Sequence, residues 1–248
     1  YSRLLDLIIY KLRKNSISLD LSEISLLCEA LRKSRIHSLD IQEIIKDSIS
    51  TIIKSKSKAK YFNIGVLGLD LQRIGVFNSE TQYYLLSSFM EEISDPQTKL
   101  SFTNKIRMLM VSKTILKNVG GEDKDIEELN SELQAKIKKD LDSMKADSII
   151  TSLCSIIDFL FKEAFKQPVS YNCQNKKFTN TSYEVVGISI PDYSNVISIL
   201  TNTLSKLELG WKMLPFDSKS KTFFGMCKSK YLFETFSEFL GKLLSKAD

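Results

Sequence analysis

Residues 21–53 read LSEISLLCEALRKSRIHSLDIQEIIKDSISTII, and residues 61–93 read YFNIGVLGLDLQRIGVFNSETQYYLLSSFMEEI. When the two stretches are aligned with an offset of 40 residues, their apolar side chains fall opposite one another. A repeat of this length is typical of stacked helical hairpins, which present a long surface and rarely perform chemistry. The matched pairs are Leu27/Leu67, Leu31/Leu71, Ile36/Val76, Ile44/Tyr84, Ile45/Leu85, Ile49/Phe89 and Ile53/Ile93.

The same period predicts helices along most of the chain. One helix covers 3–14, and a second begins after Asp20 or Ser22 and ends before Ser34. Further helices are expected over 40–53, 63–74, 79–93, 100–119, 122–144 and 147–166. Polar residues mark matching helix starts in the two units, because Ser38 and Asp40 align with Asn78 and Glu80. We therefore expect an all-α fold, an α-solenoid of stacked helical hairpins, with residues 1–166 forming a helical-repeat array.

The helical period ends near Gln167. Residues 177–190 alternate with β-branched side chains, so an irregular insertion near 167–190 is expected to hold a small β-hairpin or an extended loop. Helices are expected again over 191–207 and 231–244, separated by a long loop over 211–225. Residues 167–248 are therefore interpreted as a degenerate or capping helical region with loop insertions, since terminal units of repeat arrays are commonly atypical.

Composition bounds the class of protein. The chain of 248 residues has 43% hydrophobic and 26% charged residues, as folded domains do, and a net charge of +5. That charge is +5 over 1–60, −3 over 61–130 and +3 over the remainder, so an anionic partner would meet the amino-terminal quarter.

No apolar run reaches the ~20 residues of a membrane span. The four cysteines lack paired spacing and are expected to be reduced thiols. Because the chain begins at Tyr1, either a targeting segment was removed or it starts inside a longer protein.

Signals for chemistry are weak. His37 is the single histidine and lies in an inter-helix break, where loop packing is the simpler interpretation. Gly65 and Gly68 fit no nucleotide-binding motif and are expected to allow close helix packing, and Gly120-Gly121 is expected to form a turn. The acidic cluster over 122–128 suits a solvated helix start. We therefore expect a protein that is not an enzyme, with no catalytic residue, no cofactor, no metal site and no small-molecule substrate.

A basic run is the strongest candidate for binding. Lysines alternate with small residues over 54–60, at the end of one predicted hairpin and the start of the next. One interpretation is a solvated linker that complements the carboxyl end of a helix. The other is a row of cations that contacts nucleic-acid phosphates without reading bases. The residues assigned to this row are Arg32, Lys33, Arg35, Lys54, Lys56, Lys58 and Lys60.

The hairpins over 21–53 and 61–93 resemble organellar helical-repeat proteins of the pentatricopeptide, octotricopeptide and heptatricopeptide kind. The resemblance implies an RNA-associated, mitochondrial protein. The repeat is longer than the pentatricopeptide one, and no consistent base-reading pair recurs, which disfavours sequence-specific RNA reading. We expect a non-catalytic component of an organellar ribonucleoprotein, namely a mitochondrial ribosome, that contacts rRNA phosphates and neighbouring proteins. The alternative is a cytoplasmic or membrane-associated scaffold that contacts proteins alone, such as an accessory subunit of a membrane or trafficking complex.

Overall fold

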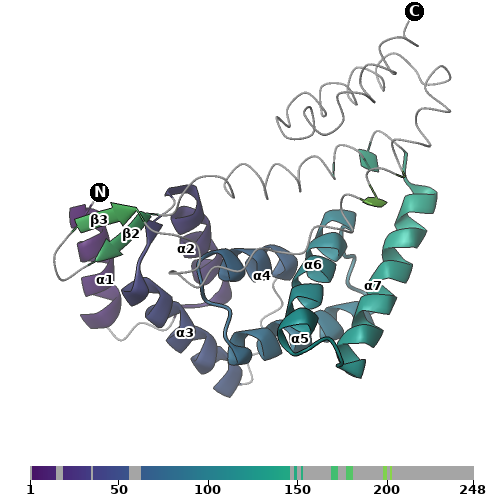
Figure 1. Ribbon diagram of the computed structural model, residues 1–248, viewed down its shortest axis with the longest axis horizontal. Helices are drawn as coiled ribbons and strands as arrows, with labels where there is room; N and C mark the ends of the chain where they lie inside the picture. The colour runs from purple at the N-terminus through teal and green to yellow at the C-terminus, as the bar shows by residue number, and fades with distance from the viewer. Residues whose placement is uncertain are drawn as a thin grey trace, which may run out of the picture.

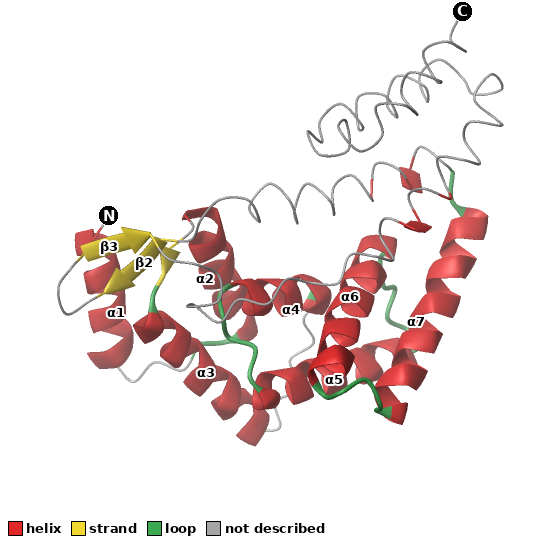
Figure 2. Ribbon diagram, viewed as in Figure 1, coloured by secondary structure: helices red, strands yellow, loops and turns green. Residues whose placement is uncertain are grey.

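Helices dominate the described part of the molecule. The computed structural model describes residues 2–14, 19–34, 36–55, 63–145, 148–149, 152, 169–172, 177–180, 198–199 and 202. These residues include the helices α1 (Ser2–Lys14), α2 (Leu21–Ser34), α3 (Leu39–Lys54), α4 (Ile64–Arg73), α5 (Ser79–Ser94), α6 (Phe102–Asn118) and α7 (Lys124–Ser143). The predicted helical class is thus confirmed for this part (Figure 2). No described helix is long and apolar enough to span a bilayer.

The helices form two rows. Helix α4 packs between α2 and α6, and these three form the inner row of an arc (Figure 1). Helix α3 packs between α1 and α5, and α5 also contacts α7. We call α1, α3, α5 and α7 the outer row; α1 and α7 lie at the two ends of the arc, where α7 also packs against α6.

The matched apolar positions of the two predicted units lie in the core. Ile45 and its counterpart Leu85 are fully buried, as are Ile49 and Phe89 to within 1%. Both second helices begin from extended backbone at the N-cap, at Ser38 and Asn78, but the Ser38 side chain makes no capping hydrogen bond. The Asn78 side chain accepts a hydrogen bond from the Thr81 backbone N–H, which satisfies one free donor of the first turn. These matched positions are therefore alike in burial, whereas the stacking of the two units as a solenoid stays a prediction.

Helix α4 approaches α6 closely through two glycines. The Gly65 backbone N–H donates to Asn104 Oδ1 at 3.1 Å. An added Cβ would lie 2.7 Å from that oxygen at Gly65, and 3.0 Å from Val111 Cγ2 at Gly68. The prediction that these glycines serve close helix packing is confirmed.

Glycine residues also end two of the three inner-row helices, α4 and α6. Gly75 has a φ of 79°, and the next residue, Val76, donates its N–H to the Leu71 carbonyl. Gly120 has a φ of 96°, and Gly121 donates to the Leu116 carbonyl in the same pattern. These are Schellman caps, which favour glycine because the cap needs a left-handed residue. The predicted Gly120-Gly121 turn is confirmed.

A small sheet joins distant parts of the chain. Strand β1 (Ile36–His37) pairs in parallel with β2 (Val169–Asn172), which pairs antiparallel with β3 (Lys177–Asn180). The β2–β3 hairpin falls inside the predicted 167–190 insertion, although β2 begins before the alternating stretch that suggested it. Residues 198–199 and 202 are helical, as expected for 191–207. Of the predicted helix over 147–166, only residues 148–149 and 152 are described, and they are helical. The predictions for 211–225 and 231–244 lie outside the described residues.

Candidate nucleic-acid interface

The predicted phosphate-contacting residues lie at helix ends. Arg32 and Lys33 belong to the last turn of α2, where the structure describes their backbone. Lys54 is the last residue of α3, and its side chain is exposed. Arg35, Lys56, Lys58 and Lys60 lie outside the described residues. The assignment of these residues to phosphate binding therefore stays a prediction.

The structure separates this predicted row into two groups. Helix α2 runs into α3 through β1, so Arg32 and Lys33 lie near the start of α3, whereas Lys54 lies at its end. Because α3 has 16 residues, its two ends are ~24 Å apart at 1.5 Å per residue. The two groups would therefore contact different stretches of a bound strand.

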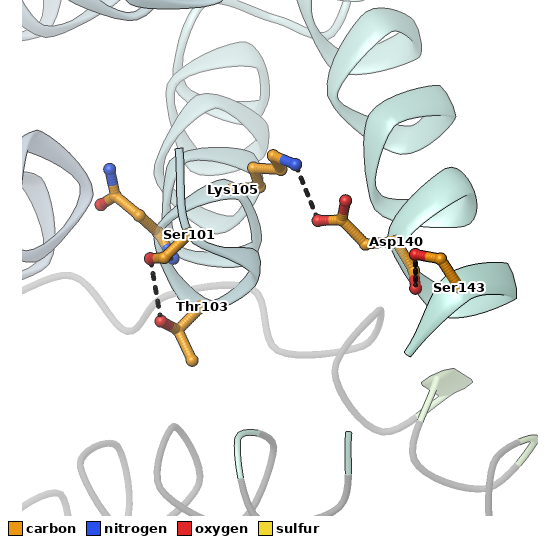
Figure 3. A network of polar contacts seen from close by, with 6 residues as sticks. Ser101, Thr103, Lys105, Asp140 and Ser143 are labelled. Atoms are coloured by element: carbon orange, nitrogen blue, oxygen red, sulfur yellow. Dashed lines mark hydrogen bonds and ion pairs between the residues drawn. The ribbon is translucent and has the colours of Figure 1, made fainter. Parts of the chain in front are cut away.

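Helix α6 of the inner row concentrates positive charge. Its sequence carries four cations and no carboxylate. One of them, Lys105, is committed to a partly buried ion pair, because its Nζ lies 2.7 Å from Asp140 Oδ2 of α7 (Figure 3). The side chains of Lys105 and Asp140 are 13% and 24% exposed, so this pair ties α6 to α7. The remaining cations are Arg107 and Lys113, which are half-buried, and Lys117, which is exposed.

Sequence reasoning missed a periodic set of cations in the inner row. Lys33, Arg73 and Lys113 follow one another at the same 40-residue offset, one each in α2, α4 and α6. Helices α4 and α6 run in parallel, because Gly65 lies against Asn104 and Gly68, further along α4, lies against Val111, further along α6. Whatever groups Arg73 and Lys113 contact, their charges add to the positive potential on this side. These three cations could have been found from the sequence, because they follow the same 40-residue offset as the apolar residues.

In three of the four outer-row helices, carboxylates outnumber cations. Helix α5 carries three carboxylates and no cation. Carboxylates also outnumber cations in α3 and α7, while α1 is basic. The positive charge of the inner row comes from α6 alone, because α2 and α4 each carry equal numbers of cations and carboxylates, and the negative charge of the outer row comes from α3, α5 and α7.

His37 is held neutral by its surroundings. The side chain is 9% exposed, and this burial lowers the pKa of His37 from 6.5 to about 4. A hydrogen bond to the backbone carbonyl of Ile74 opposes the shift. The same carbonyl accepts from Gln42 Nε2, so these polar groups fasten the start of α3 to the end of α4. The expected packing role of His37 agrees with this position.

Buried and capping positions account for several other reactive side chains. Burial, with the Asp70 carboxylate second, raises the pKa of the Cys28 thiol well above its ordinary value, so Cys28 is a protonated core residue. Asp123 caps α7, where its Oδ1 accepts from the backbone N–H groups of Asp125 and Ile126. The acidic cluster therefore begins a helix as expected. Within the described ranges, no group of three or more His, Cys, Asp or Glu side chains is placed to hold a metal ion.

Tyr83 and Tyr84 of α5 differ in exposure. Tyr83 is 70% exposed, whereas Tyr84 packs partly buried against the core. Burial raises the pKa of Tyr84, and a hydrogen bond with Ser88 opposes that shift. Of these two tyrosines, Tyr83 is therefore the one whose side chain is accessible to a partner.

Comparisons with known proteins give no further assignment. No protein-family model, no curated protein and no solved structure matches the chain.

Proposed function

We propose that the protein is a non-catalytic α-solenoid scaffold of a ribonucleoprotein, which contacts RNA phosphates and neighbouring proteins. The contrast between the basic helix α6 of the inner row and the acidic helix α5 of the outer row carries this proposal. A helix with four cations and no carboxylate favours a polyanion nearby, because the summed positive potential attracts phosphates. A helix with three carboxylates on the other side repels the same polyanion and is suited to protein contacts.

The repeat architecture supports the scaffold part of the proposal. The α2–α3 and α4–α5 hairpins bury matched apolar residues, α2 packs against α4, and α3 packs against α5. Such arrays expose long surfaces that suit extended partners. The resemblance to organellar helical-repeat proteins favours a mitochondrial assembly, specifically a ribosome. Co-sedimentation of the protein with mitochondrial ribosomal particles tests that location, and recovery only in RNA-free fractions would contradict it.

The basic segment provides the direct test of RNA contact. Replacing Lys54, Lys56, Lys58 and Lys60 together with Ser should weaken association with single-stranded RNA and leave the melting temperature nearly unchanged. Each phosphate contact contributes about 0.7 to the slope of log affinity against log salt, so losing four contacts should reduce the slope by about 3. Fluorescence anisotropy with a labelled RNA over a salt series measures both quantities.

A matched control removes the same charge elsewhere. Lys124, Lys138, Lys139 and Lys145 are exposed residues of α7 or its end. Their joint replacement with Ser should leave the salt slope unchanged, because they belong to the outer row. If the first variant keeps full RNA affinity, the phosphate row is wrong; if both variants lose affinity equally, the binding follows net charge alone.

The rival function is a scaffold for proteins without nucleic acid. The acidic helix α5, with an exposed tyrosine and methionine, favours this alternative for the outer side of the arc. The two functions differ in salt dependence, since phosphate contacts lose affinity steeply between low and moderate salt. Absence of RNA binding by the wild-type protein at low salt would leave the protein-only scaffold.

A further inference from the structure

The outward face of α5 has an unusual composition for a solvated helix. Its exposed residues between Glu80 and Ser94 are Glu80, Tyr83, Ser87, Met90, Glu91 and Ser94. At 100° per residue these positions fall on a single side of the helix, with Met90 at one edge, Glu80 and Glu91 at the other, and Tyr83, Ser87 and Ser94 between them. Tyr83 is 70% exposed and Met90 is 36% exposed. Thus an aromatic ring and a thioether flank a small serine on a face that has no lysine or arginine.

Helix α7 of the same row shows what a solvated face looks like in this protein. Its exposed side mixes both signs of charge, and Glu132 pairs with Lys136 at 3.2 Å, four residues along. Mixed charges at this spacing are typical of helices that face water. The α5 face lacks such pairs, and its tyrosine and methionine are residue types enriched in protein interfaces.

The acidic side of the α5 face is positioned by α3. Glu80 Oε2 accepts a hydrogen bond from Ser50 Oγ of α3 at 2.7 Å, which holds this carboxylate beside the neighbouring helix. Glu91 lies on the same edge of the face as Glu80, opposite the edge that carries Met90. A partner that covers the whole width of this face therefore lies against Tyr83 and Met90 on one side and along an edge with two carboxylates on the other.

We propose that this outward face of α5 docks a lysine- and arginine-rich segment of a neighbouring protein, which inserts an apolar side chain between Tyr83 and Met90. Charge complementarity selects this partner, because cations gain from the carboxylates while an RNA strand or an acidic peptide is repelled. The inference deepens the protein-contacting part of the proposed function. It does not depend on RNA contact at the inner row.

Site-specific photo-crosslinking in the assembled state tests the partner. A photoreactive p-benzoylphenylalanine replaces Tyr83 in the full chain, expressed in its native cells, and mass spectrometry identifies the attached peptide. The expected product is a peptide from another protein with several Lys or Arg residues around the attachment point. Attachment to RNA, to a second copy of this chain or to an acidic peptide overturns the proposal, as does the absence of any product.

Two charge-neutralised variants test the role of the carboxylates. Glu80→Gln combined with Glu91→Gln in the crosslinking chain should reduce the yield of that product at least tenfold. The matched control, Glu128→Gln with Asp142→Asn, removes the same charge from exposed positions of α7 and should change the yield less than twofold. Equal yields from both variants would overturn the proposal. RNA affinity should be unchanged in each, so failure of RNA binding and failure of this docking face are separate outcomes.

Discussion

Gly65 shows how one residue sets the spacing between two helices. Its missing side chain lets the α4 backbone donate to Asn104 of α6, and Gly68 makes room for Val111 one turn later. In an exposed helix, alanine would be favoured over glycine by about 1 kcal/mol. Here the space that glycine leaves open is occupied by atoms of α6, so the usual preference is reversed.

Replacing Gly65 with Ala should therefore lower the free energy of unfolding by about 1–3 kcal/mol, because overpacking forces the helices apart. The effect should exceed that of Gly68→Ala. At Gly65 the added carbon would lie 2.9 Å from the backbone oxygen of Asn104, whereas at Gly68 it meets side-chain atoms of Val111 at 3.0 Å. Urea denaturation of the two variants measures the order, and greater stability of Gly65→Ala than of the wild type would contradict the close approach.

His37 makes stability depend on pH. Its pKa is about 4 in the folded protein and 6.5 in the unfolded chain, so between these values the unfolded chain binds the extra proton. The free energy of unfolding should therefore fall as pH drops from 6.5 to 4, by up to about 3 kcal/mol from this residue.

The variant His37→Phe isolates this contribution, since Phe77 occupies the aligned position of the second unit. Thermal or urea unfolding at several pH values between 7 and 4.5 should give a flatter dependence for the variant. Parallel curves for variant and wild type would mean that His37 titrates alike in both states.

At the scale of elements, the apolar period predicted the seven helices of the described part to within a few residues at each end. Helix existence follows from the spacing of residues such as Ile45 and Ile49, which lie on one buried side of α3. Strand β1 was not predicted, because two residues carry no period and its partner Val169 lies far along the chain. The β2–β3 hairpin was placed only approximately, since alternation continued beyond the end of β3.

The register of the second hairpin gives a quantitative prediction. Leu67 is fully buried in α4, so Leu67→Ala should cost ~2–5 kcal/mol of unfolding free energy. Leu26→Ala is the matched control in α2, where the side chain is 66% exposed and truncation should change stability by less than about 0.5 kcal/mol. Chemical denaturation measures both, and similar small effects would mean that the apolar phase of α4 is wrong.

At the scale of the whole molecule, sequence reasoning found cations but not their arrangement. The composition of α5 and of α6 is visible in the sequence, yet their assignment to opposite rows requires the packing of α4 between α2 and α6. The predicted group at Arg32 and Lys33 is likewise separated from Lys54 by the length of α3. Charge patterns in repeat proteins acquire meaning only after the rows are known, because neighbours in space are whole repeats apart in sequence.

The pairing of Ile36 and His37 with Val169 and Ser170 has a mechanical consequence. Strand β2 follows α7 in the sequence, yet it lies beside α1 and α2, at the opposite end of the arc from α7 (Figure 1). In a helical-repeat array each unit contacts only its neighbours, so small changes at each contact can alter the curvature of the whole array. Here the pairing of β1 with β2 adds main-chain bonds between distant parts of the chain, so moving β2 away from the end of α2 must first break those bonds.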